Sequence, residues 1–392
     1  MFQLGLAHAR MCYFYLLLLF MVSCRFEGVK NDQCDLHENR CVLHLVGKKE
    51  FHVNENISVL TQYIQYIDTL NMFSLYNKYD NAIYFFDYPD GKQKRKIQLM
   101  REGDNGVGLI QGYDYVNEDS IFVYNYGTGY AYMVNSEGKL LWKKSLPVLD
   151  AAWSDLRPAF PYVETDSPIV YADRKLFFCG MRSSESPLET STNSPIMTIY
   201  DFQTDSVFFR LNYPEQYQKY SWGGGFCRRP YFTVNRHKSL AVVSFPQDHN
   251  LYVYSLQDGK QSKYYSGSRL VDRIEAYDEK KGVQSDENRV LRWFYSVPSY
   301  RCVIYDKKRD LYYRLACLSE KKNADEFISA TQPIVLIVLD GQFNYIGEAV
   351  LPEDVDFRRT NCFSTDGGFF IQALTDNDDL MTFYQFKVDI HE

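Results

Sequence analysis

The stretch LIQGYDYVNEDSIFVYNYGTGYAYMVNSEGKLLWKKSL, residues 109–146, decides the fold. It holds four apolar or alternating runs rich in aromatic and β-branched residues, separated by polar turn residues. The last two runs form a hairpin with Glu137 and Gly138 at its tip. Tight hairpin turns need positive φ angles, which glycine adopts without steric cost. The stretch therefore predicts one antiparallel unit of four strands.

The same hairpin pattern recurs along the chain, at residues 82–99, 196–211, 251–265 and 334–351. Three tips carry a glycine, and the fourth has Thr204 and Asp205; the glycines are Gly91, Gly259 and Gly341. Further strand candidates precede the hairpins, including VLRWFYSV (290–297) ahead of the last one. The run at 57–70 fits either a strand or a short helix. Four strands per repeat are typical of a β-propeller.

Five such units cover residues 57–351, and both ends of the chain hold strands without a unit of their own. Residues 41–53 are expected to form a strand pair, and two or three strands follow residue 360. A sixth blade built from both ends would close the ring and hide the open sheet edges. We therefore predict an all-β, six-bladed β-propeller as a single domain, residues 41–392, with five or seven blades as alternatives.

The first 23 residues predict an export signal. Arg10 is their one Asp, Glu, Lys or Arg residue, and the apolar core from Cys12 to Val22 is shorter than the roughly 20 residues that a membrane-spanning helix needs. The core runs into FMVSC, which resembles a bacterial lipoprotein box with Cys24 as the lipidated residue. Residues 24–40 would then be the lipidated N-terminus and a tether. The alternative is an ordinary signal peptide, residues 1–23, with a chance cysteine.

Arg25 follows the lipobox cysteine, where some inner-membrane lipoproteins carry Asp, and no acidic run follows. We therefore expect a cell-envelope protein anchored in the outer membrane and facing the periplasm, with the cell surface as the alternative. The net charge of −7 argues against a nucleic-acid partner, because phosphate binding favours a basic face.

The nine cysteines show no dense disulfide framework. Cys34 and Cys41 could form a local bridge. Together with His37 and His44 they have spacings that can bind zinc. A spacing of three in a strand, however, places Cys41 and His44 on opposite faces.

Gly103, Gly106 and Gly108 lie just ahead of the strand that begins near residue 109. GDNGVG lacks the Lys and the Ser or Thr of a phosphate-binding loop, and a strand follows it instead of a helix. These glycines are therefore expected to shape the link between blades one and two. Trp142 is expected to pack one blade on the next.

The stretch EGDNGVGLIQGYDYVNEDSIFVYNY, followed by NSEGKLLWKKSL, resembles lipoproteins of Bacteroidetes that are grouped in the domain-of-unknown-function 4221 family. The resemblance extends from about Cys41 to residue 392. It implies a TolB-like six-bladed propeller, and it supplies no established activity and no functional residues.

Two groups of residues are candidate sites. The segment YSWGGGFCRRPYF (220–232) offers Trp222, Arg228 and Arg229 for a carboxylate, phosphate or sugar, unless it is a loop beside a packing tryptophan. Oxygen ligands suited to Ca²⁺ near the channel are Asp114, Asn235 and Asp366. No other cofactor is expected.

We expect a membrane-anchored binding or scaffold module that presents its rim loops to a protein, glycan or small-anion partner. The alternative is a metal-dependent hydrolase or lyase acting in the channel. Three or more converging carboxylates without competing Lys or Arg would favour the enzyme, and a plugged channel would exclude it.

Overall fold

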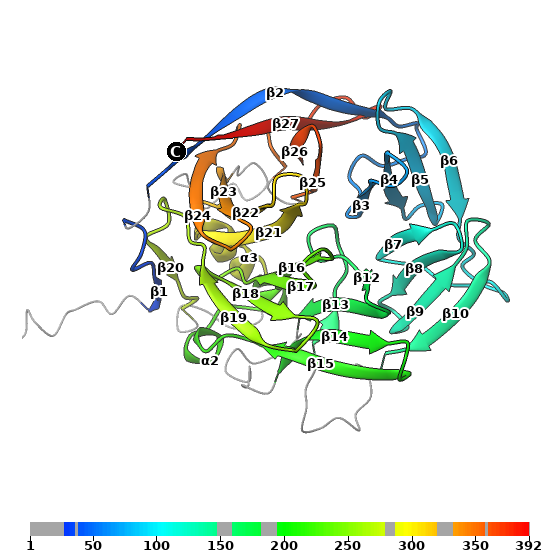
Figure 1. Cartoon of the computed structure of the whole chain (residues 1–392), viewed down its shortest axis with the longest axis horizontal. Coiled ribbons are helices and arrows are strands. Elements are labelled where there is room, and N and C mark those ends of the chain that lie inside the picture. The colour runs from blue at the N-terminus through cyan, green and yellow to red at the C-terminus, as the bar shows by residue number, and fades with distance from the viewer. Residues whose placement is uncertain are drawn as a thin grey trace, which may run out of the picture.

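Six antiparallel sheets form the blades of a propeller around a central axis (Figure 1). The structure is a computed structural model and describes residues 27–35, 38–146, 159–181, 194–278, 287–319, 332–356 and 360–391. The predicted all-β, six-bladed propeller is confirmed. No helix in the described part of the chain is long and apolar enough to cross a membrane.

Each blade runs from an inner strand nearest the axis through two middle strands to an outer strand. Blades one and two are β3 (Ile64–Ile67), β4 (Met72–Asn77), β5 (Ala82–Asp87), β6 (Gln93–Gln98) and β7 (Gly112–Asn117), β8 (Ser120–Asn125), β9 (Tyr130–Val134), β10 (Leu140–Ser145). Blade three is β12 (Val170–Ala172), β13 (Lys175–Met181), β14 (Pro195–Asp201), β15 (Ser206–Asn212), with β11 (Phe160–Pro161) also paired to β13.

The other three blades follow the same order. Blade four is β16 (Tyr231–Asn235), β17 (Leu240–Ser244), β18 (Asn250–Ser255), β19 (Gln261–Tyr265). Blade five is β21 (Ser299–Asp306), β22 (Leu311–Cys317), β23 (Ile334–Asp340), β24 (Tyr345–Val350). Blade six is β25 (Cys362–Thr365), β26 (Gly368–Gln372), β27 (Leu380–Ile390), β2 (Cys41–His52). The described residues also form the short helices α2 (Gln216–Lys219), η4 (Gly225–Arg228) and α3 (Glu287–Ser296).

Strands from both terminal regions build blade six, as predicted. β2 and β27 pair from Cys41 opposite Ile390 to His52 opposite Leu380, and they lie side by side in Figure 1. The expected strand pair at 41–53 was wrong, because residues 41–52 form one strand. A β-bulge between Leu45 and Gly47 bends this strand without a turn.

Aromatic side chains pack one blade on the next. Phe51 of blade six stacks on Phe73 of blade one with 3.9 Å between ring centroids. The ring of Trp142 on β10 lies 5.1 Å from Tyr200 and 4.9 Å from Phe202 of blade three, which confirms its packing role. Such contacts contribute to stability beyond the area that they bury.

The hairpin tips use glycine as predicted at three positions, where φ is +69° at Gly91, +75° at Gly138 and +73° at Gly259. Gly341 differs, because the positive φ of its hairpin falls on Phe343, at +69°. Gly341 instead allows close approach, since a Cβ built there would lie 2.1 Å from the carboxylate of Asp310.

The three glycines of GDNGVG shape the link between β6 and β7, as predicted. Gly103 and Gly108 have φ values of +86° and +68°. The amide of Gly106 donates to the carbonyl of Gly103 at 2.9 Å, and Gly108 donates to Arg101 at 3.2 Å. These bonds fold the link into a compact turn.

Two local predictions are corrected or resolved. VLRWFYSV was expected as a strand, but it lies mainly in α3. Val290, Trp293, Phe294 and Val297 recur at helical spacing, and Phe294 and Val297 are buried. Within 57–70, the structure forms the strand β3 and turns, and no helix.

The expected tether is largely docked on the ring. β1 (Gly28–Lys30) pairs with β20 (Arg273–Glu275). The side chain of Asn31 is buried and donates to the carbonyls of Ser268 and Val271 at 2.9 and 2.8 Å. These bonds hold the segment on the linker between blades four and five.

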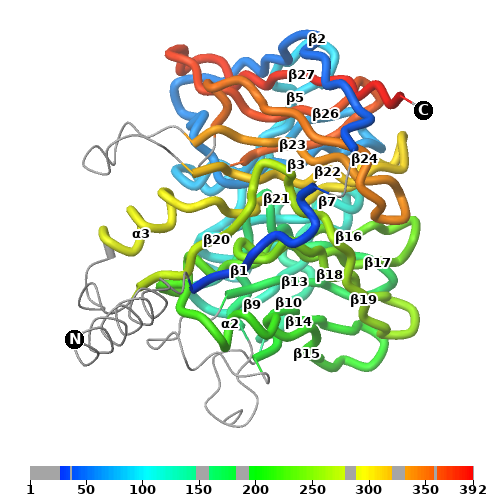
Figure 2. Tube along the Cα trace, turned by 90° about the vertical axis from the view of Figure 1, so that its left-hand side faces the viewer, coloured from blue at the N-terminus to red at the C-terminus, as the bar shows by residue number. Residues whose placement is uncertain are grey.

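The ring has two faces because all six inner strands run in the same direction. We call the face where they begin the leading face, and the face where they end the channel-mouth face. α3 directly precedes β21 and so lies on the leading face, from which it projects in Figure 2. The backbone carbonyl of Glu27 accepts a bond from Ala276, next to Tyr277, whose amide donates to Ser221 in the leading-face loop before β16. The N-terminal segment therefore meets the ring on the leading face.

Candidate functional site

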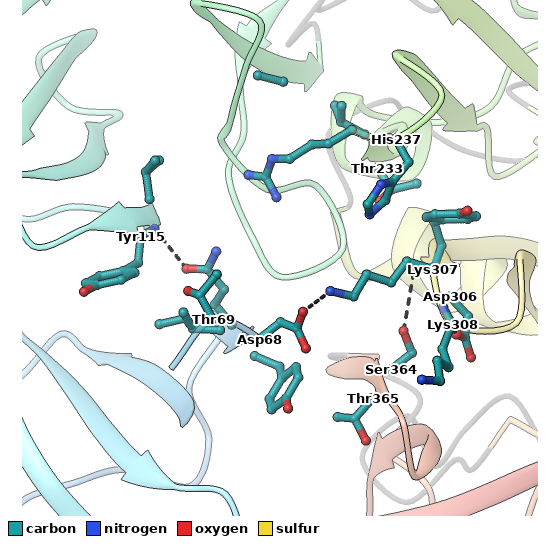
Figure 3. A pocket seen from close by; sticks show the side chains of 18 of the residues that line it. Asp68, Thr69, Tyr115, Thr233, His237, Asp306, Lys307, Lys308, Ser364 and Thr365 are labelled. Atoms are coloured by element: carbon teal, nitrogen blue, oxygen red, sulfur yellow. Dashed lines mark hydrogen bonds and ion pairs between the residues drawn. The ribbon is translucent and has the colours of Figure 1, made fainter. Parts of the chain in front are cut away.

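A cavity of about 570 Å³ opens on the channel-mouth face, and the ends of all six inner strands line it. We call it the channel-mouth cavity (Figure 3). Its lining residues are 65–69 from blade one, 115–116 from blade two, 171–172 from blade three, 233–234 and 236–237 from blade four, 305–308 from blade five, and 364–366 from blade six. Its volume lies in the range typical of pockets for small ligands.

One ion pair joins blades one and five across the mouth. The ammonium group of Lys307 is paired with the carboxylate of Asp68, as Figure 3 shows. Both side chains remain about half exposed, at 48% and 50%. Because blade six lies between these two blades, the pair spans the blade-six side of the opening and stays accessible to a ligand.

A second ion pair joins blades four and two. Arg236 donates from Nη2 to Asp114 Oδ2 at 2.7 Å and from Nε to the carbonyl of Tyr171 at 3.1 Å. Asp114 is buried and also accepts bonds from the side chain of Gln65 at 2.9 Å and the amide of Tyr171 at 2.6 Å. Its oxygens serve this network, so Asp114 is not an open metal ligand.

The other two Ca²⁺ candidates do not converge with Asp114. Asn235 is buried, accepts bonds from the amides of His237 and Lys238, and donates to the hydroxyl of Tyr312 at 2.7 Å. Asp366 lines the cavity, but its side chain is 74% exposed and lies 3.5 Å from the ammonium group of Lys308. Within the described residues no cluster of three His, Cys, Asp or Glu could hold a metal ion. The prediction of a calcium site is therefore corrected: Asp114 and Asn235 have structural roles, and Asp366 lies at the surface.

Tyrosines form rigid walls around the charged groups. The hydroxyls of Tyr66, Tyr115 and Tyr305 bond to side chains outside the cavity, at Asn71, Glu118 and Asp310. Burial raises the pKa of all three phenols, so they stay protonated at neutral pH. Their hydroxyl bonds hold the three rings as flat surfaces in the wall of the cavity.

Behind the cavity, a loop from blade three crosses the axis of the ring. We call residues 164–167 the axial loop. Thr165 bonds to Gln62 and Ile64 of blade one, through its amide and its hydroxyl respectively. The carbonyl of Asp166 accepts from Phe232 of blade four. Since these partners lie on different sides of the ring, the axial loop crosses the leading end of the channel. It has the same green as β12 in Figure 1 and lies within the ring.

The predicted ligand-binding residues Trp222, Arg228 and Arg229 lie inside the protein. Trp222 is fully buried and donates from Nε1 to the carbonyl of Gln216 at 3.0 Å. Arg228 is 2% exposed. Arg229 is paired with Asp166 at 2.8 Å and Glu164 at 2.9 Å. This prediction is corrected: the segment packs blade four against the axial loop, and none of the three lines the channel-mouth cavity.

The structure bears on one of the two cysteine predictions. Cys34 and Cys41 are both free, so the bridge considered between them is not formed in the structure. The thiol of Cys41 instead lies 3.6 Å from the side-chain oxygen of Asn39. His37 of the zinc alternative lies outside the described residues, as does the lipidation candidate Cys24.

Sequence reasoning missed the channel-mouth residues because they come from six separate turns. The available signal was the polar turn directly after each inner strand, as in YDKKRD (305–310) and VNRHK (234–238). Because a propeller places these turns on one face, the repeat pattern could have predicted that Lys307 and Arg236 lie on the same face.

The fold and the cavity define a six-bladed propeller with a ligand-sized opening on one face. The family model described as "Domain of unknown function (DUF4221)" matches residues 42–350. The chain belongs to this DUF4221 family, as the resemblance in the sequence implied.

Solved structures agree with this fold. A member of the DUF4221 family from Bacteroides vulgatus is 18% identical, with a TM-score of 0.75 over 90% of this chain and 100% of that one. A "Putative exported protein" from Bacteroides fragilis is 12% identical, with a TM-score of 0.55 over 93% of this chain and 97% of that one. Among curated proteins, no significant sequence match is found.

Proposed function

We propose that this protein is a membrane-anchored, extracytoplasmic binding module that receives a charged segment of a protein partner in the channel-mouth cavity. The observation that carries the proposal is the accessible pair of Asp68 and Lys307, which stands among fixed tyrosine rings at the convergence of all six blades. Mixed charges beside aromatic surfaces suit a peptide segment with side chains of both signs.

The charge balance of the cavity favours a protein over a neutral glycan. The lining contains three carboxylates, Asp68, Asp306 and Asp366, and three permanent cations, Arg236, Lys307 and Lys308. Asp306 is occupied by Arg309, at 2.8 Å, and by the turn that follows it. The other five side chains are about half exposed or more: Asp68, Asp366, Arg236, Lys307 and Lys308. The hydroxyls of a neutral sugar could bond to them but would offer no opposite charge, which a charged peptide segment does.

The position at which the N-terminal segment docks supports an orientation in which this cavity opens away from the membrane. Glu27 lies on the leading face, and Cys24 precedes it by three residues, which span at most about 11 Å when extended. A lipid on Cys24 would hold the leading face near the membrane. The channel-mouth face would then point away from the membrane.

The compartment is part of the proposal. An exported location is supported by residues 1–23, which resemble a signal peptide, and by the similar structure from Bacteroides fragilis, which is that of a "Putative exported protein". We place the anchor in the outer membrane with the propeller in the periplasm. Fractionation of a Cys24→Ala variant tests the anchor: this variant should leave the membrane fraction, and continued membrane retention would contradict lipidation.

Affinity capture from gently solubilised membranes tests the binding site. Lys307→Ala should reduce recovery of a partner at least about tenfold if Lys307 contributes about 1.4 kcal/mol to binding. Lys144→Ala is the matched control, since Lys144 also forms an exposed pair, with Asp205 at 2.7 Å, but on the outer strand β10. Equal recovery with the two variants would overturn the site.

A second variant pair separates charge recognition from loss of structure. Exchanging the two residues, Asp68→Lys with Lys307→Asp, keeps an ion pair but reverses its direction. A protein partner read by charge should be lost in this exchange while the melting temperature is retained. Capture of a neutral glycan that is insensitive to the exchange would replace the protein proposal.

The metal-dependent enzyme considered from the sequence does not meet the criterion that favours it, which is three converging carboxylates without competing Lys or Arg. Lys307, Lys308 and Arg236 share the cavity with its carboxylates and compete with a metal ion for them, and the axial loop crosses the channel behind them. No observation on the described residues favours that alternative.

A further inference from the structure

Two buried thiols face each other where blade five meets blade six. Cys302 lies on β21 and Cys362 begins β25, and both are inner strands. Their sulfur atoms are 3.2 Å apart, and the residues are 1% and 5% exposed. The two cysteines are 60 positions apart in sequence, so the fold alone brings them together.

The backbone aims Cys302 toward blade six. The register between β21 and β22 shifts between Tyr300 and Val303, so Cys302 lies in a bulge. Bulges of this kind redirect a side chain away from its own sheet. Cys362 pairs in regular register with Ile371 of β26. The contact therefore arises from a distortion confined to one partner.

No other pair of sulfur atoms lies within hydrogen-bonding distance in the part of the chain that the structure describes. The buried thiols of Cys179 and Cys317 provide a comparison, since both are fully buried but no other thiol lies within hydrogen-bonding distance of either in the described residues. Burial alone accounts for those two, because cysteine behaves as a small apolar residue. It does not account for two thiols in contact.

We propose that Cys302 and Cys362 form a disulfide that links the inner strands of blades five and six in the exported protein. This inference rests on the exported location within the proposed function, because disulfides persist in oxidising compartments. Closing the bond requires the sulfurs to approach from 3.2 Å to about 2.05 Å.

The oxidation needs an acceptor of two electrons. A thiol–disulfide oxidant of the envelope supplies it: one protein thiolate attacks the disulfide of the oxidant and releases one of its sulfurs as a thiol. The second protein thiolate then attacks the mixed disulfide and releases the reduced oxidant. Two protons leave the protein thiols overall. Because both cysteines are buried in the finished ring, the reaction belongs to the stage before blade six closes.

The bond would strengthen the junction beside the channel. Thr360, two residues before Cys362, donates to Asp166 of the axial loop at 3.1 Å. Asn361 donates to the carbonyl of Thr61 in blade one at 2.9 Å. A covalent link at Cys362 would thus fix a segment that already joins blade six to blades one and three.

Differential alkylation of the native lipoprotein tests the proposal. Free thiols are blocked with N-ethylmaleimide under denaturing, acid-quenched conditions, and the protein is then reduced and treated with iodoacetamide. Peptide mass spectrometry should find iodoacetamide on most of Cys302 and Cys362, and N-ethylmaleimide on Cys179 and Cys317. N-ethylmaleimide on Cys302 and Cys362 in this material would overturn the proposal.

Two variants and a refolding arm keep geometry and location distinct. In Cys302→Ser, Cys362 should carry N-ethylmaleimide, because it has lost its partner. The matched Cys317→Ser should leave the bridge intact. Refolding the reduced full chain in an oxidising glutathione buffer should form the same bridge. A bridge in the refolded protein but not in the cell-derived protein rejects the native disulfide and calls the location into question, which fractionation then decides. No bridge in either rejects the geometry.

Discussion

The carboxylate of Asp166 accepts hydrogen bonds from both Nη atoms of Arg229, at 2.8 and 3.1 Å, in the interior of the ring. The two residues are 63 positions apart and belong to different blades. Their pairing fastens the axial loop to blade four and explains why the arginine of an apparent ligand loop is not available to a ligand. It also makes this interaction the first one to test.

Breaking the pair should destabilise the protein strongly. Arg229→Met leaves Asp166 buried without its cation, and the loss of one partner of a buried pair costs about 3–5 kcal/mol. Urea unfolding should show this as a lower midpoint. Lys94→Ala is the control, because Lys94 and Asp90 form an exposed pair worth less than about 1 kcal/mol. Similar losses for the two variants would contradict a fastening role for Arg229.

Asp114 should behave as a structural residue and not as a calcium ligand. Asp114→Asn weakens its bond to Arg236 and should lower the free energy of unfolding by about 1–3 kcal/mol. Removing divalent cations with EDTA should leave the melting temperature of the unsubstituted protein unchanged. A melting temperature that rises with added Ca²⁺ and no longer does so in Asp114→Asn would restore the calcium interpretation.

His249 should make stability fall as the pH is lowered. Burial lowers the pKa of its imidazole to about 4, while the unfolded chain has a pKa near 6.5. The unfolded state therefore binds the proton first, and stability is lost as the pH falls from about 6.5 to about 4, by about 3 kcal/mol in total. Protonation would also remove the acceptor at Nδ1, which lies 2.7 Å from the hydroxyl of Tyr300.

Urea midpoints of the unsubstituted protein and His249→Asn at pH 7.5, 6.0 and 5.0 check this dependence. The substituted protein should show a shallower decline with pH. His52→Asn, at an exposed position, controls for the loss of a histidine. A decline that is equally steep in all three proteins would assign the acid sensitivity to other groups.

Substitutions of Gly138 and Gly103 distinguish the cost of backbone strain from the cost of disturbed blade packing. Both have positive φ, so alanine costs about 1–2 kcal/mol at either position. A Cβ at Gly138 would also lie 2.2 Å from the carbonyl oxygen of Gln98 in blade one, whereas a Cβ at Gly103 would meet nothing within 4 Å. Gly138→Ala should therefore cost about 1–3 kcal/mol more than Gly103→Ala in urea unfolding. Equal costs would show that the hairpin tip moves freely away from blade one.

The architecture was predictable because its signals are local and repeated. Each hairpin tip, such as Glu137–Gly138, marks the third and fourth strands of a blade. The unpaired strands at the two ends then required a shared sixth blade. α3 was missed because its aromatic residues suit a strand as well as a helix. The burial of Phe294 in the structure distinguishes the helix from the strand.

The candidate site was less predictable because its contacts are long-range. Lys307 and Asp68 are 239 positions apart, and Thr360 reaches Asp166 across 194. Nothing near Arg229 in sequence reveals that Glu164 and Asp166 neutralise it. A glycine-rich segment with arginines therefore resembled an exposed binding loop, although its partners lie in another blade.

The pairing of β2 with β27 also sets an order of events during synthesis. The ribosome makes β2 before any complete blade, yet its partner is the last described strand to be made. The ring cannot close until Leu380–Ile390 has been translated, so every shorter product retains an unpaired strand. Closure of the last blade thus distinguishes a finished chain from an interrupted one, and it leaves interrupted chains open to proteolysis.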